Sequence, residues 1–400
     1  MPHTVVLTLP EYGHMNAALV LAEELAQGGE QVTVYGTEPF RAAIAAAGAS
    51  YREYGPAAAF APPPHAGGLY SVMAFLAGLT ETLLPRLVEE LRSPRPDYLL
   101  LDSMCLWGNL AQQVLRVPAA MLGAVFVSHD QHHTPDEFVR QVYADAPTPV
   151  LVAAIDGLNT YLMQSQRLER AFGVRCPNIV RFFGQRQARN LLFTSRRFHP
   201  AGERYDDSFA FVGPMIPAHA PALEAPLPPG NAPLIYISLG TIFNQAPEFF
   251  RACFEALGEA PCRVLVSTGG GVEAAGLGPA PANFTIRAFV PQLAVLGQAA
   301  VCVTHAGMNT TSEALWQGVP LLCLPQHGDQ WLVAERVAAL GAGLTLPPPA
   351  RGAAHLRRGV ERLLHEPGFR QQAQRLSGEF RAEGGAARAA ALVRRWRAEA

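Results

Sequence analysis

The sequence of 400 residues contains no lysine, so all 31 residues of its Lys+Arg count are arginine. This absence excludes a P-loop, which grips phosphate with a lysine, and a protein kinase, which needs a lysine on a strand. It also excludes a pyridoxal phosphate enzyme, whose cofactor forms a Schiff base with lysine. An enzyme with this sequence that handles phosphate must use arginine, histidine, a metal ion or backbone N–H groups.

The sequence also has few charged residues, no closely spaced cysteine pairs and no long apolar runs. Charged residues make up 16% of the chain and the formal net charge is −2, so no global field attracts nucleic acid or an anionic membrane. The six cysteines include no C-x-x-C pair, which is typical of a reduced cytosolic protein without a zinc or thioredoxin-like site. The first apolar run ends at Pro10 and the longest, 117–127, is shorter than the roughly 20 residues that cross a bilayer. We expect a cytoplasmic protein without stable membrane insertion.

Strand and helix patterns alternate in two runs that a proline-rich stretch separates. Continuously apolar runs such as 98–101 are typical of parallel strands buried on both faces. Residues 213–233 hold seven prolines and cannot form a helix or a central strand, so we interpret them as an interdomain linker. The pattern predicts an N-terminal domain at 1–212 and a C-terminal domain at 234–400, each a doubly wound, Rossmann-like α/β sheet.

The predicted elements follow from apolar periodicity. Strands are predicted at 5–9, 31–35, 98–101, 119–122, 234–239, 263–267, 285–289, 301–304 and 321–324. Helices are predicted at 17–26, 39–47, 105–115, 150–172, 248–257, 309–317, 330–340 and 355–364. The less regular residues 123–200 are interpreted as an insertion on the first domain.

Open parallel sheets bind ligands outside the carboxyl ends of their strands, so polar residues that follow strands are candidate site residues. His14 follows the first strand, in the segment before the first helix, and Asp102 ends another strand. A histidine, with its pKa near about 6.5, suits a general base, and a carboxylate can orient its ring. His14 can equally be a helix-entry residue or a hydrogen-bonded loop residue, and Asp102 a helix N-cap.

The strongest local signal is the segment 301–313, VCVTHAGMNTTSE, where a strand leads through a glycine-containing turn into a helix. A helix N-terminus offers backbone N–H groups and a partial positive charge, so it can bind a diphosphate without lysine, and His305 can add a donor. The alternative is an ordinary capped helix, because Thr310 and Glu313 fit a capping box. The turn at 240–241 offers a weaker site of the same kind.

Two further polar segments need interpretation. Asp329 and Gln330 open a helix after the strand at 321–324, where a carboxylate and an amide suit sugar hydroxyls, although Asp329 can also be only a cap. The histidine cluster at 129–133 has no helical spacing, so we expect a polar loop that lines a substrate cleft rather than a metal site. No Asp-x-Asp pair occurs, so no Mg²⁺ or Mn²⁺ site is indicated.

The stretch 289–330 resembles the nucleotide-sugar signature of family 1, UDP-glycosyltransferase-like, glycosyltransferases. The ordered matches are Val-Pro-Gln at 290–292, Leu296, Thr-His-x-Gly-x-Asn at 304–309, Glu313, Gly-Val-Pro at 318–320 and Pro-Gln-x-x-Asp-Gln at 325–330. Gly13-His14, the 102–107 segment and Ser-Leu-Gly-Thr at 238–241 extend the resemblance, and the most similar subgroup is the bacterial macrolide glycosyltransferases. Ala306 stands where glycine or cysteine is more usual, and a proline that often follows His-x-Asn is absent, which leaves the donor sugar open.

The resemblance implies a GT-B architecture of two facing Rossmann-like domains with a cleft between them, the acceptor on the first and the nucleotide sugar on the second. The last helix is expected to pack back on the first domain. His14 would be the general base and Asp102 its partner. The donor would be held by Phe289 and Val290 at the base, Gln292 and Glu313 at the nucleoside, Thr241, His305, Gly307, Asn309 and Thr310 at the diphosphate, and Asp329 and Gln330 at the sugar.

We therefore expect inverting, metal-independent transfer of a sugar from UDP-glucose or a dTDP-deoxysugar to a hydroxyl of a hydrophobic small molecule, such as a macrolide, another polyketide or a flavonoid. No further cofactor and no nucleic acid partner is expected, and a homodimer stays open. The apolar segments 55–80 and 123–150 predict the hydrophobic acceptor, with contacts from Phe60, Phe75, Leu76, Trp107, Phe126 and His129, although these segments can also be ordinary loops and core. The alternatives are a GT-B-fold sugar-nucleotide epimerase and a non-catalytic sugar-nucleotide-binding protein, although the latter would be expected to lack His14 or Asp102.

Overall fold

The computed structural model describes residues 1–61, 68–127, 148–218, 223, 227, 229–241, 244–326, 328–348 and 351–400. The chain divides into two compact units. The first contains Met1–Phe193, Arg204–Met215 and Ala386–Ala400, and the second contains Thr194–Glu203 and Ile216–Gly385. The chain therefore enters the second unit briefly at Thr194–Glu203, returns to the first unit, and enters the second unit again at Ile216, within the proline-rich stretch. It returns to the first unit with its last helix.

The first unit contains a seven-stranded sheet whose neighbouring strands all pair in parallel. Its strand order is β3-β2-β1-β4-β5-β6-β7. The strands are β1 (His3–Leu7), β2 (Gln31–Gly36), β3 (Ser50–Glu53), β4 (Tyr98–Asp102), β5 (Ala119–Gly123), β6 (Arg189–Leu192) and β7 (Phe209–Phe211). Every residue of β4 and β5 is buried, as the continuously apolar runs predict for central parallel strands.

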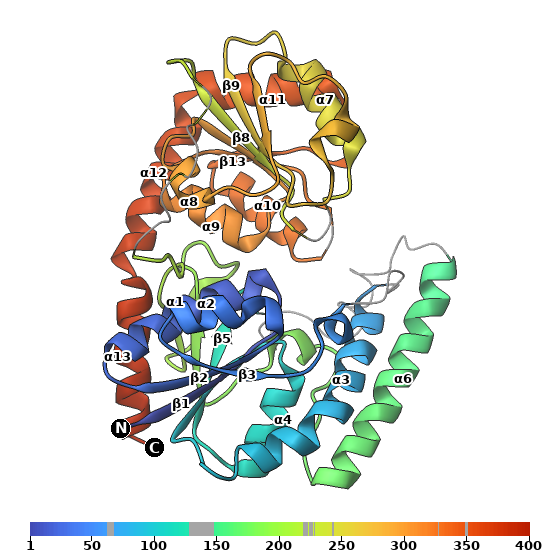
Figure 1. The fold of residues 1–400 in the computed structure, drawn as a ribbon, viewed down its shortest axis with the longest axis vertical. Coiled ribbons are helices and arrows are strands. Elements are labelled where there is room, and N and C mark those ends of the chain that lie inside the picture. The colour runs from blue at the N-terminus through green and yellow to red at the C-terminus, as the bar shows by residue number, and fades with distance from the viewer. Residues whose placement is uncertain are drawn as a thin grey trace. The chain divides into compact units, whose positions relative to one another are not determined.

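Helices cover both faces of this sheet (Figure 1). Successive side chains of a strand point to opposite faces, so Val5 and Leu7 lie in one hydrophobic core and Val6 in another. The core with Val5 includes side chains of α3 (Leu69–Glu90), α4 (Leu106–Leu115) and α6 (Thr148–Phe172). The core with Val6 includes side chains of α1 (Tyr12–Gln27), α2 (Arg41–Ala46) and α13 (Gly385–Ala398).

Helix α3 departs from the prediction, because residues 55–80 carry no predicted element and Leu69–Glu90 forms 22 residues of helix. In the first half of the helix most side chains between the buried positions are also apolar, among them Val72 and Leu79, so this half lacks the polar face that marks an amphipathic helix. By length and composition this helix could cross a bilayer, but half of its apolar window is buried inside the unit. That burial accounts for its hydrophobicity.

The second unit contains a six-stranded parallel sheet in the order β10-β9-β8-β11-β12-β13. Its strands are β8 (Leu234–Ser238), β9 (Arg263–Ser267), β10 (Phe284–Arg287), β11 (Val301–Thr304), β12 (Leu321–Cys323) and β13 (Gly343–Thr345). Its helices are α7 (Pro247–Leu257), α8 (Gln292–Leu296), α9 (Met308–Trp316), α10 (Gln330–Ala339), α11 (Ala353–His365) and α12 (Pro367–Ala382). The fold of each unit is thus the predicted doubly wound α/β sheet.

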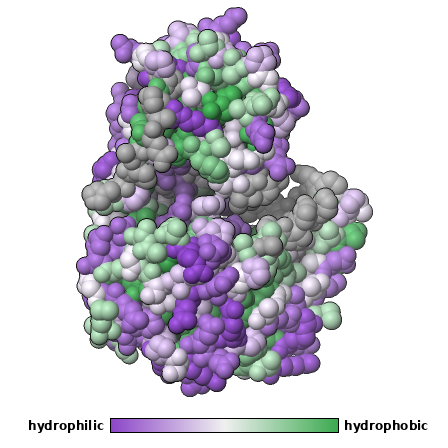
Figure 2. Space-filling model, viewed as in Figure 1, coloured by the Kyte–Doolittle hydropathy of each residue, from purple (hydrophilic) through white to green (hydrophobic). Residues whose placement is uncertain are grey.

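Low overall charge does not leave the surface uniformly apolar. Figure 2 shows hydrophilic and hydrophobic residues interspersed over the visible face. The large apolar side chains that are exposed within the described residues gather mainly on α6, at Leu151, Val152, Ile155, Leu162 and Met163.

The last helix is held in the first unit by a buried carboxylate as well as by apolar contacts. Glu30, only 3% exposed at its side chain, pairs with Arg394 at 3.0 Å and with Arg397, and it accepts a hydrogen bond from Thr4 at 3.1 Å. Burying a carboxylate is favourable only when its charge is paired. The contacts of Glu30 therefore hold α13 against the beginning of β1 and β2.

We expect the substitution Glu30→Gln to lower the free energy of unfolding by about 2 kcal/mol, because two arginines then face a neutral amide in a partly buried setting. Urea denaturation measures this change. Glu399→Gln is the matched control, since Glu399 pairs with Arg189 and Arg395 at half-exposed positions, where a pair contributes about 0.5 kcal/mol or less. Equal losses in the two variants would contradict this role of Glu30.

Candidate functional site

Each sheet has one point at which the strand order reverses, and candidate residues follow the strands at both points. In the first sheet the reversal lies between β1 and β4, and in the second between β8 and β11. The crevice outside the carboxyl ends of the strands at such a switch point is the general ligand site of open α/β sheets. His14 and Asp102 belong to the first switch point, and Gly240 and His305 to the second.

His14 and Asp102, 88 residues apart in sequence, are in direct contact. The Nδ1 atom of His14 lies 2.7 Å from Oδ2 of Asp102, and the two residues are 8% and 1% exposed. A carboxylate only accepts hydrogen bonds, so Nδ1 carries the hydrogen and Nε2 keeps its lone pair. The pair thus has the arrangement of an oriented general base.

The structure distinguishes between the alternatives that the sequence left open for both residues. His14 is a helix-entry residue in the first turn of α1, two residues after its first residue Tyr12, and not a loop residue. Asp102 is not the N-cap of α4, because that position is Cys105. The Asp102 carboxylate instead accepts hydrogen bonds from the Met104 N–H at 2.8 Å and the Thr8 hydroxyl at 3.3 Å. These donors fix the carboxylate against His14.

At the second switch point, the ring of His305 lies between two glycines. A Cβ atom at Gly240 would lie 2.7 Å from the His305 Cε1, and one at Gly307 would lie 2.4 Å from Nε2. Gly240 also has φ of +77°, a conformation that favours glycine. Both glycines are therefore required by the placement of this ring. Ala306 between the ring and the helix has φ of +64°, which is uncommon for a residue with a side chain.

Burial lowers the pKa of His305 to about 4, and a hydrogen bond with the Ser238 backbone opposes this effect only in part. The ring is therefore neutral at pH 7 in the unliganded chain. A neutral imidazole has one N–H, so His305 differs from a permanently cationic phosphate ligand such as arginine.

Helix α9 begins directly after this turn, with Gly307 as its N-cap and without a side-chain capping bond. The capping-box alternative is therefore wrong, since Thr310 and Glu313 are used differently. The first N–H groups of a helix have no acceptor within it and carry partial positive charge. The turn from Gly307 through Asn309 to Thr310 thus presents backbone donors at the switch point.

Gln292, the first residue of α8, links the second sheet to α9. Its Nε2 donates to Glu313 at 2.9 Å and to Thr310 at 3.3 Å, and its Oε1 accepts from the Tyr236 hydroxyl at 2.9 Å. Burial raises the pKa of Glu313, and the Gln292 hydrogen bond lowers it in part. The structure therefore brings together Gln292, Thr310 and Glu313, three of the candidate donor residues.

The remaining donor candidates lie at the same carboxyl edge. Phe289, after β10, is 65% exposed. A Cβ atom added at Gly270, in the loop after β9, would lie 3.4 Å from the Phe289 ring. Val290 is partly buried and Thr241 is exposed. Gln330 is 8% exposed, and its Oε1 accepts from the Gln326 backbone at 2.8 Å. Asp329 is the N-cap of α10 without a side-chain capping bond.

The candidate acceptor contacts are placed less favourably. Trp107 is 0% exposed, Leu76 3% and Phe60 8%, and all three lie in the hydrophobic core of the first unit. Their apolar character is explained by packing, and they offer almost no surface to a ligand. Phe75 is partly buried against the same core, and Phe126 is partly buried near the end of β5. His129 lies outside the described residues.

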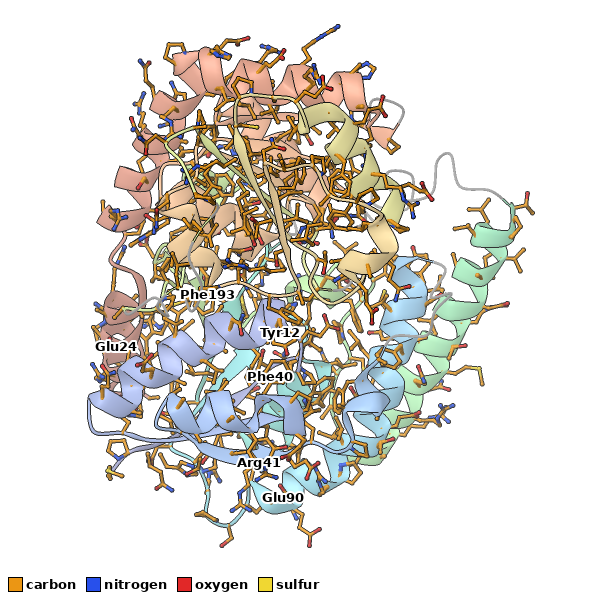
Figure 3. All side chains as sticks on the ribbon, turned by 45° about the horizontal axis from the view of Figure 1, so that its top comes forward. Tyr12, Glu24, Phe40, Arg41, Glu90 and Phe193 are labelled. Atoms are coloured by element: carbon orange, nitrogen blue, oxygen red, sulfur yellow. The ribbon has the colours of Figure 1, made fainter. Side chains whose placement is uncertain are left out.

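Tyr12 is an exposed aromatic residue that the sequence analysis does not identify. It begins α1, two residues before His14, and is 51% exposed. Its ring makes an edge contact with the buried Phe40 at a centroid distance of 5.0 Å, and Figure 3 shows the two rings next to each other at the start of α1. The signal in the sequence that could have identified Tyr12 is its position two residues before the candidate base His14. Among the described residues, no group of three or more His, Cys, Asp or Glu side chains could hold a metal ion.

Comparison with known proteins agrees with this geometry. Residues 255–391 match the family described as erythromycin biosynthesis protein CIII-like, C-terminal domain. The chain is 31% identical over 394 residues to the NDP-glycosyltransferase YjiC of Bacillus subtilis, which covers 98% of this chain and 96% of that protein. It is 30% identical over 408 residues to the demethyllactenocin mycarosyltransferase of Streptomyces fradiae, which covers 98% of this chain and 86% of that protein.

A solved structure of the glycotransferase of kitacinnamycin is also similar, with a TM-score of 0.85, 26% identity and coverage of 99% of both chains. The similarity to glycosyltransferases extends over both units, including both switch points. The chain therefore belongs to the bacterial macrolide and natural-product glycosyltransferases, with the two parallel-sheet α/β domains of the GT-B fold.

Proposed function

We propose that this glycosyltransferase, which acts on nucleotide sugars, transfers a sugar with inversion to a hydroxyl of a hydrophobic small molecule, and that His14 is its general base. The observation that carries the proposal is the buried 2.7 Å contact between His14 and Asp102 at the first switch point. In this proposal the first unit binds the acceptor and the second binds the donor. UDP-glucose and dTDP-deoxysugars are the candidate donors, and macrolides, other polyketides and flavonoids the candidate acceptors.

The proposed reaction is a single displacement. The Nε2 atom of His14 takes the proton of the acceptor hydroxyl while the oxygen attacks the anomeric carbon on the side opposite the leaving group. The bond from that carbon to the diphosphate oxygen breaks, and the nucleoside diphosphate leaves with the electron pair. Asp102 stabilises the imidazolium that forms, and general base catalysis of this kind contributes about 10²–10⁴-fold.

The leaving diphosphate gains charge as the bond breaks, and this charge must be stabilised. We propose that the first N–H groups of α9, from Gly307 to Thr310, and the His305 ring do this. The groups at the second switch point are mainly N–H donors rather than paired carboxylates, which supports a reaction without a metal ion. Thr241 would contact the diphosphate, and Asp329 and Gln330 would bind the hydroxyls of the transferred sugar.

The base and the acceptor have their own candidate contacts. Phe289 presents an exposed ring on which a pyrimidine can stack, and the Val290 backbone would pair with its edge. Tyr12, exposed beside the His14 turn, is the better candidate for an apolar acceptor contact than the buried Trp107. We further propose that transfer takes place in the cytoplasm without membrane insertion. A homodimer stays a prediction.

The alternatives are not favoured. An epimerase would act on the donor alone and would need no acceptor, whereas the relatives that cover this chain are named as glycosyltransferases. A non-catalytic binding protein has no need of the buried His14–Asp102 pair, which is intact here. NMR of the donor incubated without an acceptor distinguishes the first alternative, and a transfer assay distinguishes the second.

The substitution His14→Ala is expected to reduce transfer at least about 100-fold and to leave nucleotide binding unchanged, because it removes the base and no donor contact. Mass spectrometry of products from UDP-glucose and dTDP-sugars with phenolic and macrolide acceptors measures transfer, and calorimetry measures UDP affinity. His355→Ala, at an exposed position of α11, is the control and should keep wild-type transfer. Near-normal turnover of His14→Ala would show that the base is wrongly assigned.

The substitution Gly307→Ala is expected to weaken UDP binding about tenfold, because the added methyl group collides with the His305 ring while the backbone φ of −63° itself tolerates alanine. Gly276→Ala is the matched control, since nothing lies within 4 Å of its added Cβ. Calorimetric titration with UDP compares the two variants. Equal affinities would mean that the His305 position does not contribute to diphosphate binding.

The neutral state of His305 predicts a pH dependence of donor binding. A diphosphate beside the ring favours its protonated form, so the bound state has a higher His305 pKa than about 4 and UDP binding takes up protons as the pH falls. The ratio of the UDP Kd of His305→Asn to that of wild type should therefore increase from pH 7 to pH 5. The full increase of about tenfold for each unit by which UDP raises the pKa is reached only below about pH 4, so the increase down to pH 5 is smaller. Comparison at each pH cancels the titration of UDP itself, and a constant ratio would exclude the contact.

A further inference from the structure

A buried hydroxyl of the second sheet reaches the nucleoside candidates through one amide. Tyr236, in the middle of β8 and 1% exposed, donates to the Gln292 Oε1, and Gln292 donates to Glu313. We propose that Tyr236 is a positioning residue for the ribose of the donor: it fixes the Gln292 amide, which in turn fixes the Glu313 carboxylate, while Gln292 itself contacts no part of the donor. The inference rests on the proposed function and changes the role expected for Gln292.

The hydrogen-bonding capacity of Gln292 supports this assignment. A glutamine amide has two N–H hydrogens and one carbonyl oxygen. Both hydrogens are directed to protein acceptors, Glu313 Oε2 at 2.9 Å and Thr310 Oγ1 at 3.3 Å, and the oxygen accepts from Tyr236 at 2.9 Å. The amide is thus engaged on both sides, and a nucleotide would have to displace one of these partners to bind it.

When Glu313 is ionised, only one of the two possible orientations of the Gln292 amide is chemically consistent. If the amide were rotated by half a turn, its carbonyl oxygen would face the Glu313 carboxylate, and two acceptors would oppose each other. The Tyr236 hydroxyl stabilises the consistent orientation, because it supplies the hydrogen that the carbonyl oxygen requires. Loss of this hydroxyl leaves a buried carbonyl without its donor, so the amide becomes free to reorient.

The charges around Glu313 show which group would bind a ligand. Two other titratable side chains are affected by its charge, the Tyr236 phenol of β8 and the Cys302 thiol of β11. Burial and the nearby Glu313 carboxylate raise the pKa values of both. Both are therefore neutral near pH 7, and Glu313 is the group of this cluster that can carry a negative charge. Burial raises the pKa of Glu313, and the Gln292 hydrogen bond opposes this effect in part, so Gln292 favours the ionised carboxylate.

The position of Glu313 matches a sugar hydroxyl pair rather than the base. Gln292, the hydrogen-bond partner of Glu313, follows Phe289 by three positions in the sequence, and the exposed Phe289 ring is the candidate stacking surface for the base. In a nucleotide the ribose is attached directly to the base, so in this proposal a base stacked on Phe289 places its ribose within reach of Glu313, whose carboxylate can accept hydrogen bonds from ribose hydroxyls. Glu313 has a second carboxylate oxygen beyond the one that Gln292 uses, which suits this task.

The test compares UDP with 2′,3′-dideoxy-UDP, which lacks both ribose hydroxyls. If wild type binds dTDP more tightly, dTDP, whose deoxyribose has only the 3′-hydroxyl, is compared with its 2′,3′-dideoxy analogue. In Tyr236→Phe, which retains the ring in the core, we expect the Kd of the nucleotide with hydroxyls to rise about fivefold to tenfold. The Kd of the dideoxy analogue should change less than twofold. Tyr98→Phe, a buried tyrosine in β4 of the first unit, is the control and should change neither Kd.

A double-mutant cycle separates positioning from a general effect on the fold. If Tyr236 acts only through Gln292, the double variant Tyr236→Phe, Gln292→Leu binds UDP no more weakly than Gln292→Leu alone. Additive losses, or equal losses for UDP and its dideoxy analogue, would overturn the inference. Wild type that binds neither UDP nor dTDP would instead overturn the proposed function, and with it this inference. Binding by wild type with an unchanged Kd in Tyr236→Phe would overturn the inference alone.

Discussion

The parallel pairing of β1 with β4 and of β8 with β11 is the constraint on which both candidate sites depend. Parallel strands place all their carboxyl ends at one edge, and the reversal of strand order separates the loops that follow the two central strands. In the first unit this brings His14 and Asp102 into contact, and in the second it brings the Gly240 turn against His305. The candidate catalytic pair and the candidate anion site are thus consequences of the same topology in two different sheets.

The absence of lysine has a structural counterpart in the second unit. The candidate diphosphate site consists of the start of α9 and a neutral histidine enclosed by glycines, so its positive character comes from backbone dipoles. Such a site has little net charge when it is empty, and it requires close approach of backbone segments. This explains why two glycines and the left-handed Ala306 gather there.

Much of the fold could be predicted, because buried parallel strands leave continuous apolar runs that are visible in the sequence. The pairing of His14 with Asp102 could also be predicted, since it needs only the positions of two strand ends. Helix α3 could not, because few polar side chains mark a solvent-facing side along its first half, and β6 could not, because it begins with Arg189 and Asn190 and so has no continuous apolar run. Side-chain partners such as Tyr236 for Gln292, and the burial of Trp107, depend on packing between distant segments that no local pattern contains.

The last helix has a consequence for how the protein is made. Its residues Ala389, Ala390, Val393 and Trp396 belong to the hydrophobic core that contains Val6 and Leu100, and its arginines neutralise the buried Glu30. During synthesis on the ribosome, the first 193 residues emerge long before residues 386–398, so the first unit lacks a wall of its core until the second unit has been translated. The two units therefore cannot fold strictly one after the other in chain order, as independent consecutive domains do.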